Sequence, residues 1–122
     1  MTPPTGGDAA PDCLFCKIVA GEIPSEEVTS DDVTYAFRDI NPGAPSHVLV
    51  VPREHITDAA ALRADHGELL GAMFATAQRV AEIDRLTGGY RLVFNVGEDG
   101  GNTVAHLHLH VLGGRSMSWP PG

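Results

Sequence analysis

The stretch His106-Leu107-His108-Leu109-His110-Val111 decides the fold of this chain. Side chains alternate between the two faces of a strand, so the three histidines share one face and the apolar residues share the other. The apolar face predicts packing onto a core, whereas the imidazoles line a surface. One satisfied core histidine would be an ordinary finding, but a row of three indicates chemistry.

The spacing of the row assigns different roles to its members. Residues two apart lie ~6.6 Å apart along a strand, which is awkward for three ligands on one ion. A histidine becomes a good nucleophile toward phosphorus when one ring nitrogen is held by an acceptor and the other faces the substrate. The middle position has the best support from its neighbours, and we therefore expect His108 to attack phosphorus.

The segment directly upstream of the row fits a phosphate ligand. Residues 97–102 read Gly-Glu-Asp-Gly-Gly-Asn and are followed by Thr103. Alone, these glycines indicate only a hairpin turn between two strands. Before a histidine row, their backbone amides and the Thr103 hydroxyl favour contact with phosphate oxygens.

The remaining pattern predicts an α+β domain. Asp65 and Glu68 indicate a helix start, and the apolar stripe that follows ends at Gly88-Gly89; its residues are Leu69, Leu70, Met73, Phe74, Ala77, Val80 and Ala81. Strands are expected at 33–39, 47–51, 90–96 and 104–112, a turn at 41–45, and a short helical turn at 13–20. We therefore expect an antiparallel sheet with one long helix packed on one face.

Composition limits the function classes. A chain of 122 residues suits one domain, expected at 13–122 behind a disordered tail at 1–12 that does not read as a secretory signal. The net charge of −8 argues against polynucleotide partners, which need clustered Lys and Arg. No apolar run is long enough for a membrane span, and we expect a cytoplasmic protein.

Several motifs resemble the histidine triad (HIT) superfamily and, within it, the histidine triad nucleotide-binding protein branch. The triad pattern lies at 106–110, and further similarity lies at 13–24, 37–42, 47–55 and 112–122. The last segment closes with Trp119-Pro-Pro-Gly122, which speaks for the nucleotide-binding branch. The resemblance covers nearly all of the chain after residue 12.

This resemblance implies a homodimer whose two sheets join into one, and a purine nucleoside phosphoramidase that releases AMP or GMP from a phosphorus–nitrogen bond. It aligns His108 with the nucleophile that forms a covalent nucleotidyl-histidine intermediate, with His47 in support. The implied nucleotide contacts are Asp39 at the ribose, Phe37 and Ile40 at the base, and Asn95, Gly101, Thr103 and His110 at the phosphate. Arg38 replaces a histidine of the eukaryotic members, and Thr103 replaces a serine. The choice between adenine and guanine stays open.

The only two cysteines, Cys13 and Cys16, form a Cys-x-x-Cys pair. Such a pair suits metal ligation or redox chemistry in a reducing compartment better than a disulfide framework. Resemblance to bacterial members that have this pair adds His55 and His106 as ligands of a structural Zn²⁺ site. Two reduced, buried cysteines without a metal are the alternative.

The end of the chain carries one more expectation. Two prolines keep Trp119-Pro-Pro-Gly122 out of a regular strand, and an aromatic so near a terminus gains little unless it packs. The resemblance implies that residues 115–122 reach the partner's pocket, whereas a simpler account lets Trp119 cover its own subunit. Two rival functions also stay open: cleavage of dinucleoside polyphosphates, and a non-catalytic nucleotide-binding module.

Overall fold

The computed structural model describes residues 10–122, so residues 1–9 of the expected tail lie outside the described residues. Residues 10–12 form a turn, in which the Cys13 N–H donates to the Ala10 carbonyl at 3.1 Å. The helices that follow are α1 (Leu14–Val19) and α2 (Gly67–Ile83), with two short 3₁₀ turns at Ala59–Ala61 and Ala64–His66. The strands are β1 (Glu27–Ser30), β2 (Thr34–Arg38), β3 (Ser46–Pro52), β4 (Tyr90–Val93) and β5 (Leu109–Gly113).

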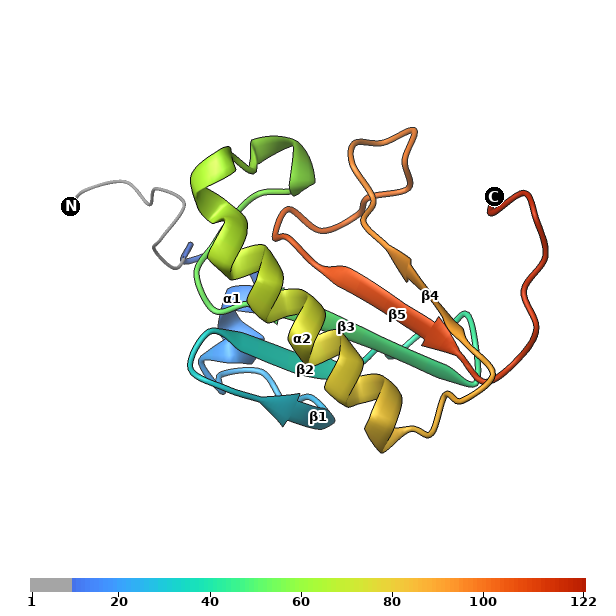
Figure 1. The fold of residues 1–122 in the computed structure, drawn as a ribbon. Helices are drawn as coiled ribbons and strands as arrows, with labels where there is room; N and C mark the ends of the chain where they lie inside the picture. The colour runs from blue at the N-terminus through green and yellow to red at the C-terminus, as the bar shows by residue number, and fades with distance from the viewer. Residues whose placement is uncertain (1–9) are drawn as a thin grey trace.

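Within residues 10–122, five strands form one antiparallel sheet in the order β1-β2-β3-β5-β4. The central strand β3 is buried along its whole length. The long helix α2 crosses one face of this sheet, and α1 lies at the other face (Figure 1). The predicted α+β class, with one long helix on an antiparallel sheet, is confirmed.

The two faces of the sheet hold two separate apolar clusters. Under α2, Val48, Val50, Leu109 and Val111 of the sheet pack with the buried face of the helix, which includes Met73. On the opposite face, residues of α1 pack on β2 and β3; this cluster contains Phe15, Ile18, Phe37, Leu49 and Val51. Each fully buried side chain of this size contributes about 1.5–3 kcal/mol, so both faces stabilise the sheet.

The histidine strand is shorter than the sequence predicts. β5 begins at Leu109, so His106 and His108 precede it, and β4 ends at Val93 instead of residue 96. Just before β5, the Leu107 N–H donates to the Ile56 carbonyl at 2.6 Å, outside any strand. The alternation of faces nevertheless continues, because Leu107 joins the cluster under α2 while its neighbouring histidines face the other way.

Both ends of α2 differ from the prediction. Asp65 lies in a 3₁₀ turn and pairs with Arg63 at 3.2 Å, so it does not cap the helix, which begins at Gly67. The helix ends at Ile83, well before Gly88, because Asp84 turns toward Arg38 and Arg85 adopts a left-handed backbone with φ 54°. Of the predicted stripe, Phe74 is exposed at the surface. In the described part of the chain, neither helix has the length and apolarity to cross a membrane.

Candidate functional site

The geometry around His108 fixes which ring nitrogen is reactive. His108 Nδ1 lies 2.7 Å from the His106 carbonyl oxygen, and only an N–H can donate to a carbonyl. In the neutral ring the proton therefore sits on Nδ1, and Nε2 keeps its lone pair. The ring is buried and is held edge-on by Phe15, with the two centroids 5.2 Å apart.

The neighbouring histidines form a chain of hydrogen bonds whose direction is also fixed. The Gly43 N–H donates to His47 Nδ1 at 2.9 Å, so the proton of neutral His47 sits on Nε2. That Nε2–H lies 2.8 Å from His110 Nδ1, which accepts it. The register of β3 against β5 sets this contact, because His110 lies opposite Leu49 and His47 is two residues away on the same face.

His110 is consequently a neutral hydrogen-bond donor. With its Nδ1 accepting from His47, its remaining proton sits on Nε2. Asn95 Nδ2 lies 3.4 Å from that nitrogen, and a flip of the Asn95 amide, which exchanges its nitrogen and oxygen, would let Oδ1 accept this proton. Burial lowers the pKa of His110 to about 4, and repulsion from the neighbouring histidines acts in the same direction. Burial also lowers the pKa of His47, although Asp39, 3.4 Å from its Nε2, opposes this.

A cavity of about 310 Å³ opens beside these histidines. That size falls within the usual range for small-molecule sites. Its polar lining includes Asp39, Thr103, His108 and His110, and its apolar lining comes from α1 and from Phe37, Ile40 and Leu49. Ile40 is 91% exposed at this cavity, where a bound apolar group would cover it.

Three of the expected nucleotide contacts do not line this cavity. Asn95 reaches it only through His110. Gly101 is exposed, and its N–H donates to the Glu98 carbonyl at 3.0 Å, so that this amide is already occupied within the turn. Trp119 is 83% exposed and stands away from the cavity of its own chain.

The α1 wall is the part of the site that sequence reasoning missed. Leu14, Phe15 and Ile18 line the cavity, joined by the following segment Ile23–Ser25. The sequence does hold a signal for this wall. Phe15 and Ile18 are apolar and three residues apart, so they lie on one face of a helix.

Arg38 lies at the wall of the cavity, but its guanidinium is paired with acidic side chains. Its guanidinium forms two hydrogen bonds with Asp84, at 2.6 and 2.8 Å, and contacts Glu26. Asp84, and to a smaller extent Glu26, raise the pKa of Arg38, and the hydrogen bonds from Arg38 lower the pKa of Asp84. Arg38 therefore links the end of β2 to the end of α2.

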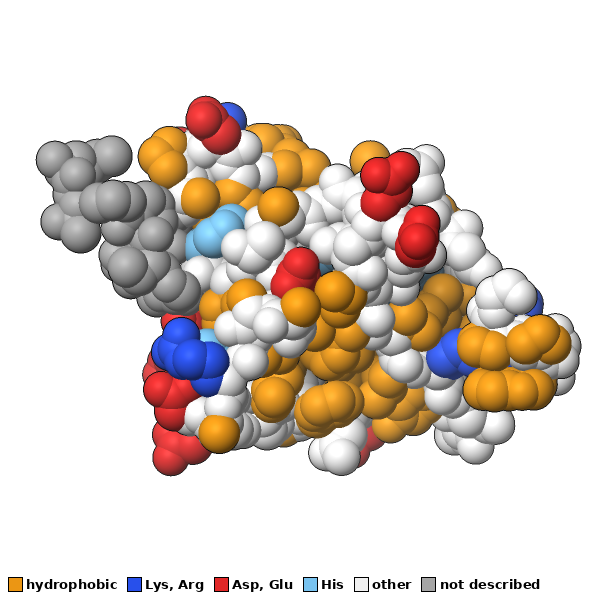
Figure 2. Space-filling view, turned by 90° about the horizontal axis from the view of Figure 1, so that it is seen from above, with side chains coloured by type: hydrophobic (Ala, Val, Ile, Leu, Met, Phe, Trp, Pro, Cys, Tyr) orange, Lys and Arg blue, Asp and Glu red, His pale blue; other side chains and the backbone are white. Residues whose placement is uncertain are grey.

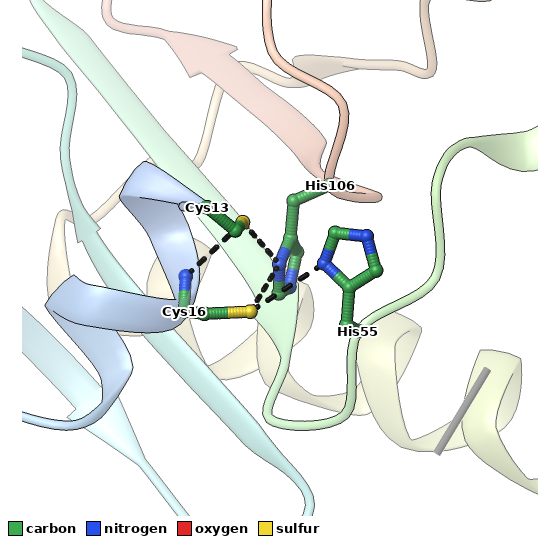
Figure 3. Close-up of side chains that lie close together, drawn as sticks. All are labelled: Cys13, Cys16, His55 and His106. Atoms are coloured by element: carbon green, nitrogen blue, oxygen red, sulfur yellow. Dashed lines mark hydrogen bonds between the residues drawn. The ribbon is translucent and has the colours of Figure 1, made fainter. Parts of the chain in front are cut away.

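The second candidate site brings together Cys13, Cys16, His55 and His106 from three separate parts of the chain (Figure 3). Their donor atoms lie within 4.8 Å of one another. Three of the sulfur–nitrogen distances are 3.2, 3.4 and 3.4 Å, close to the roughly 3.6 Å edge that tetrahedral Zn–S and Zn–N bonds would give. The four expected ligands are thus brought together.

The surroundings of this cluster prepare its donors for a metal. His106 Nε2 lies 3.0 Å from the Pro52 carbonyl and donates to it, which leaves Nδ1 free to bind a metal. Burial lowers the pKa of His106 to about 4, so the ring is neutral. The Cys13 and Cys16 sulfurs accept N–H groups from Cys16 and Ala10 at 3.3 and 3.4 Å. Burial raises the pKa of the Cys16 thiol, and a bound cation would reverse that effect.

An α+β fold whose antiparallel sheet carries a row of histidines beside a cavity is typical of the histidine triad proteins. The chain belongs to the HIT domain family, whose match covers residues 20–117. It is similar to an uncharacterised HIT-like protein of Synechococcus elongatus, with 49% identity over 91% of this chain and 97% of that protein. A 14 kDa zinc-binding protein of Zea mays is 46% identical over 89% of this chain and 87% of its own length.

Among solved structures, a HIT family hydrolase from Legionella pneumophila matches with a TM-score of 0.89 and 50% identity. The match covers 91% of this chain and all of that one (100%). The protein is therefore a hydrolase-like member of the HIT family, with a Cys/His cluster able to hold a metal.

Proposed function

We propose that this protein is a purine nucleoside phosphoramidase of the histidine triad nucleotide-binding branch, with His108 as its nucleophile. The observation that carries the proposal is the Nδ1–H of His108, held at 2.7 Å by the His106 carbonyl. This contact leaves the Nε2 lone pair beside a cavity of about 310 Å³, which a nucleoside monophosphate would occupy.

The proposed reaction has two steps. His108 Nε2 attacks the phosphorus of an AMP-amine or GMP-amine, the phosphorus–nitrogen bond breaks, and the amine leaves with a proton taken from solvent. Water then attacks the nucleotidyl-histidine, its proton is lost to solvent, and the nucleoside monophosphate and free His108 are restored. The His110 Nε2–H and the Thr103 hydroxyl would donate to phosphate oxygens as negative charge develops.

The nucleoside half of the substrate would occupy the rest of the cavity. Asp39 would accept hydrogen bonds from the ribose hydroxyls, and Phe37 and Ile40 would flank the base. The turn that follows Asp39 holds this side chain in place, because Asp39 Oδ1 accepts the Asn41 N–H at 2.9 Å. Asn95 would act at the phosphate by way of His110.

The decisive experiment is a substrate panel. Purified protein is incubated with adenosine and guanosine phosphoramidates and, in parallel, with dinucleoside polyphosphates. We expect release of AMP or GMP from the phosphoramidates. Preferential cleavage of dinucleoside polyphosphates would assign the protein to the neighbouring enzyme class, and nucleotide binding without any turnover would indicate a binding module.

We further propose that the Cys/His cluster holds a structural Zn²⁺. Cys13, Cys16, His55 and His106 would bind it, which suits a closed four-ligand site with no open position for substrate. The Zea mays relative described as a zinc-binding protein supports the choice of metal. The ion supplies folding free energy, because it joins α1 to the segment before β5.

We also propose a symmetric homodimer. Among the described strands, β4 is the last in the sheet, and its Tyr90 and Leu92 are 40% and 38% exposed. An open edge with apolar side chains is suited to pairing with a second copy. On the same side of the molecule as β4, the C-terminal segment projects from the body with apolar side chains at its surface (Figure 1 and Figure 2). It would reach the partner's pocket.

A further inference from the structure

We propose that the Cys/His cluster positions the nucleotide pocket, so that metal loading strengthens nucleotide binding and nucleotide binding strengthens metal binding. This inference rests on the proposed function, because it takes a nucleoside monophosphate as the ligand of the cavity. The structure offers two physical routes between the two sites, one through α1 and one through His106.

The first route is the helix that carries the cysteines. Cys13 caps α1 and Cys16 lies within its six residues. A helix this short is not stable alone, so its position depends on its anchors. Between the two cysteines sits Phe15, which is 5% exposed and lines the cavity.

Phe15 is placed to transmit the position of α1. Its ring contacts Phe37 of β2 and His108 edge-on, with centroid distances of 5.4 and 5.2 Å. It therefore touches both the wall expected at the base and the expected nucleophile. A shift of α1 would therefore shift Phe15 against both of these groups, so Phe15 acts as a positioning residue for Phe37 and His108.

The second route is the backbone of His106. The ring of this residue faces Cys13 and Cys16 through Nδ1, at 3.2 and 3.4 Å, while its carbonyl holds His108. A metal that fixes the His106 ring thereby also restricts the peptide group that orients the nucleophile.

Reciprocity makes the coupling measurable from either site. If metal changes the AMP affinity by some factor, AMP must change the metal affinity by the same factor. His55 provides the cleanest variant, because it contacts the cluster but does not line the cavity and does not lie on α1.

The test measures AMP dissociation constants by titration calorimetry for the zinc-loaded protein, the His55→Ala variant and the zinc-loaded Phe15→Leu variant. The temperature is kept below every thermal transition, as circular dichroism verifies. We expect weakening of about fivefold to tenfold in both variants, within the usual range for coupled sites. His66→Ala, at a histidine outside both sites, is the matched control and should bind AMP like the parent protein.

The outcomes separate this inference from the proposed function. Equal AMP affinity in the loaded protein and folded His55→Ala overturns the coupling but leaves the proposed function standing. Absence of AMP binding to the loaded parent protein overturns both. If His55→Ala does not fold, the cobalt-substituted parent protein is titrated with AMP. Saturable changes in its d–d absorption support the coupling, and an unchanged spectrum overturns it.

Discussion

His108 and His110 are two residues apart, yet their hydrogen bonds require opposite tautomers. The His106 carbonyl holds the proton of His108 on Nδ1, whereas His47 donates to Nδ1 of His110 and leaves the proton on Nε2. One ring thus offers a lone pair and its neighbour a hydrogen-bond donor. The lone pair suits a nucleophile, and the donor suits the negative charge that develops on the phosphate during the reaction.

Replacing His108 by Ala should lower turnover of an AMP-amine by about three orders of magnitude or more, because the attacking group is lost. AMP should still bind. Quenching the parent enzyme during turnover should trap a nucleotide mass adduct on the peptide that contains residues 106–110. An adduct on another residue, or normal turnover by the variant, would contradict the assignment.

Burial of His110 predicts loss of stability in acid. Its pKa falls from 6.5 to about 4 in the folded chain, so between these values the unfolded chain binds a proton that the folded chain does not. The contribution of His110 to stability is therefore complete above pH 6.5, falls as the pH drops toward about 4, and does not change further below that.

Urea unfolding at several pH values in this window measures the effect. His110→Asn should reduce the pH slope of the unfolding free energy by up to about 1.4 kcal/mol per pH unit, the value for one proton. An unchanged slope in this variant would show that His110 is not the titrating group.

Most of the individual site residues could be predicted from the sequence, because the histidine row and the Asp39 segment are specific patterns. The tautomers could not. They depend on the Gly43 N–H and the His106 carbonyl, which are backbone groups that every sequence possesses. Only the folded structure shows where they point.

At the scale of elements, Gly71 and Gly100 differ in the space around them, and we expect their replacement by alanine to have opposite effects on stability. A Cβ on Gly71 would meet nothing within 4 Å, and this residue lies exposed inside α2. A Cβ on Gly100 would overlap the Val96 carbonyl oxygen, which is a backbone atom and cannot easily move.

Gly71→Ala should therefore stabilise the protein by about 0.5–1 kcal/mol through helix propensity. Gly100→Ala should destabilise it by about 1–3 kcal/mol through overpacking and should weaken phosphate binding, because Thr103 follows the same turn. Chemical denaturation compares the two variants directly. Equal effects would mean that the turn relaxes without cost.

The next prediction concerns the Cys/His cluster. Purified protein should contain about one zinc per chain, as a closed tetrahedral site requires, and Cys13→Ala/Cys16→Ala should lose it. The double variant should also unfold at a lower temperature, because α1 loses its anchor. Elemental analysis and a thermal melt measure both effects. Full zinc content in the variant would exclude these ligands.

Element types were easier to predict than element ends. α2 stops at Ile83 because Asp84 pairs with Arg38 of β2, a contact between residues distant in sequence. β5 starts late because the Leu107 N–H is used by Ile56. The α1 wall was missed for a similar reason, since a cysteine pair predicts a metal and says nothing about the neighbouring Phe15.

For the whole molecule, the position of Trp119 is the strongest argument for assembly. A tryptophan that is 83% exposed leaves a large apolar surface in water unless another chain covers it. The Ser118 carbonyl accepts a hydrogen bond from Arg91 at 2.9 Å, so the start of this segment is tied to β4, the strand expected at the dimer contact.

Sedimentation should accordingly show a dimer. Deleting residues 117–122 should change the ranking of a series of AMP-amine substrates that differ in the leaving amine, while AMP binds as before. A full-length monomer, or the same substrate ranking in the truncated protein, would contradict this role of the segment.

The double use of His106 has a consequence for which substitutions the family pattern can tolerate. Its ring faces the cysteine pair, while the group that orients His108 is a peptide carbonyl that any amino acid would supply. Three thiolates and one imidazole also form a common zinc ligand set. We therefore expect His106→Cys to keep both its zinc and its turnover, because the carbonyl group that orients His108 does not depend on which side chain position 106 carries.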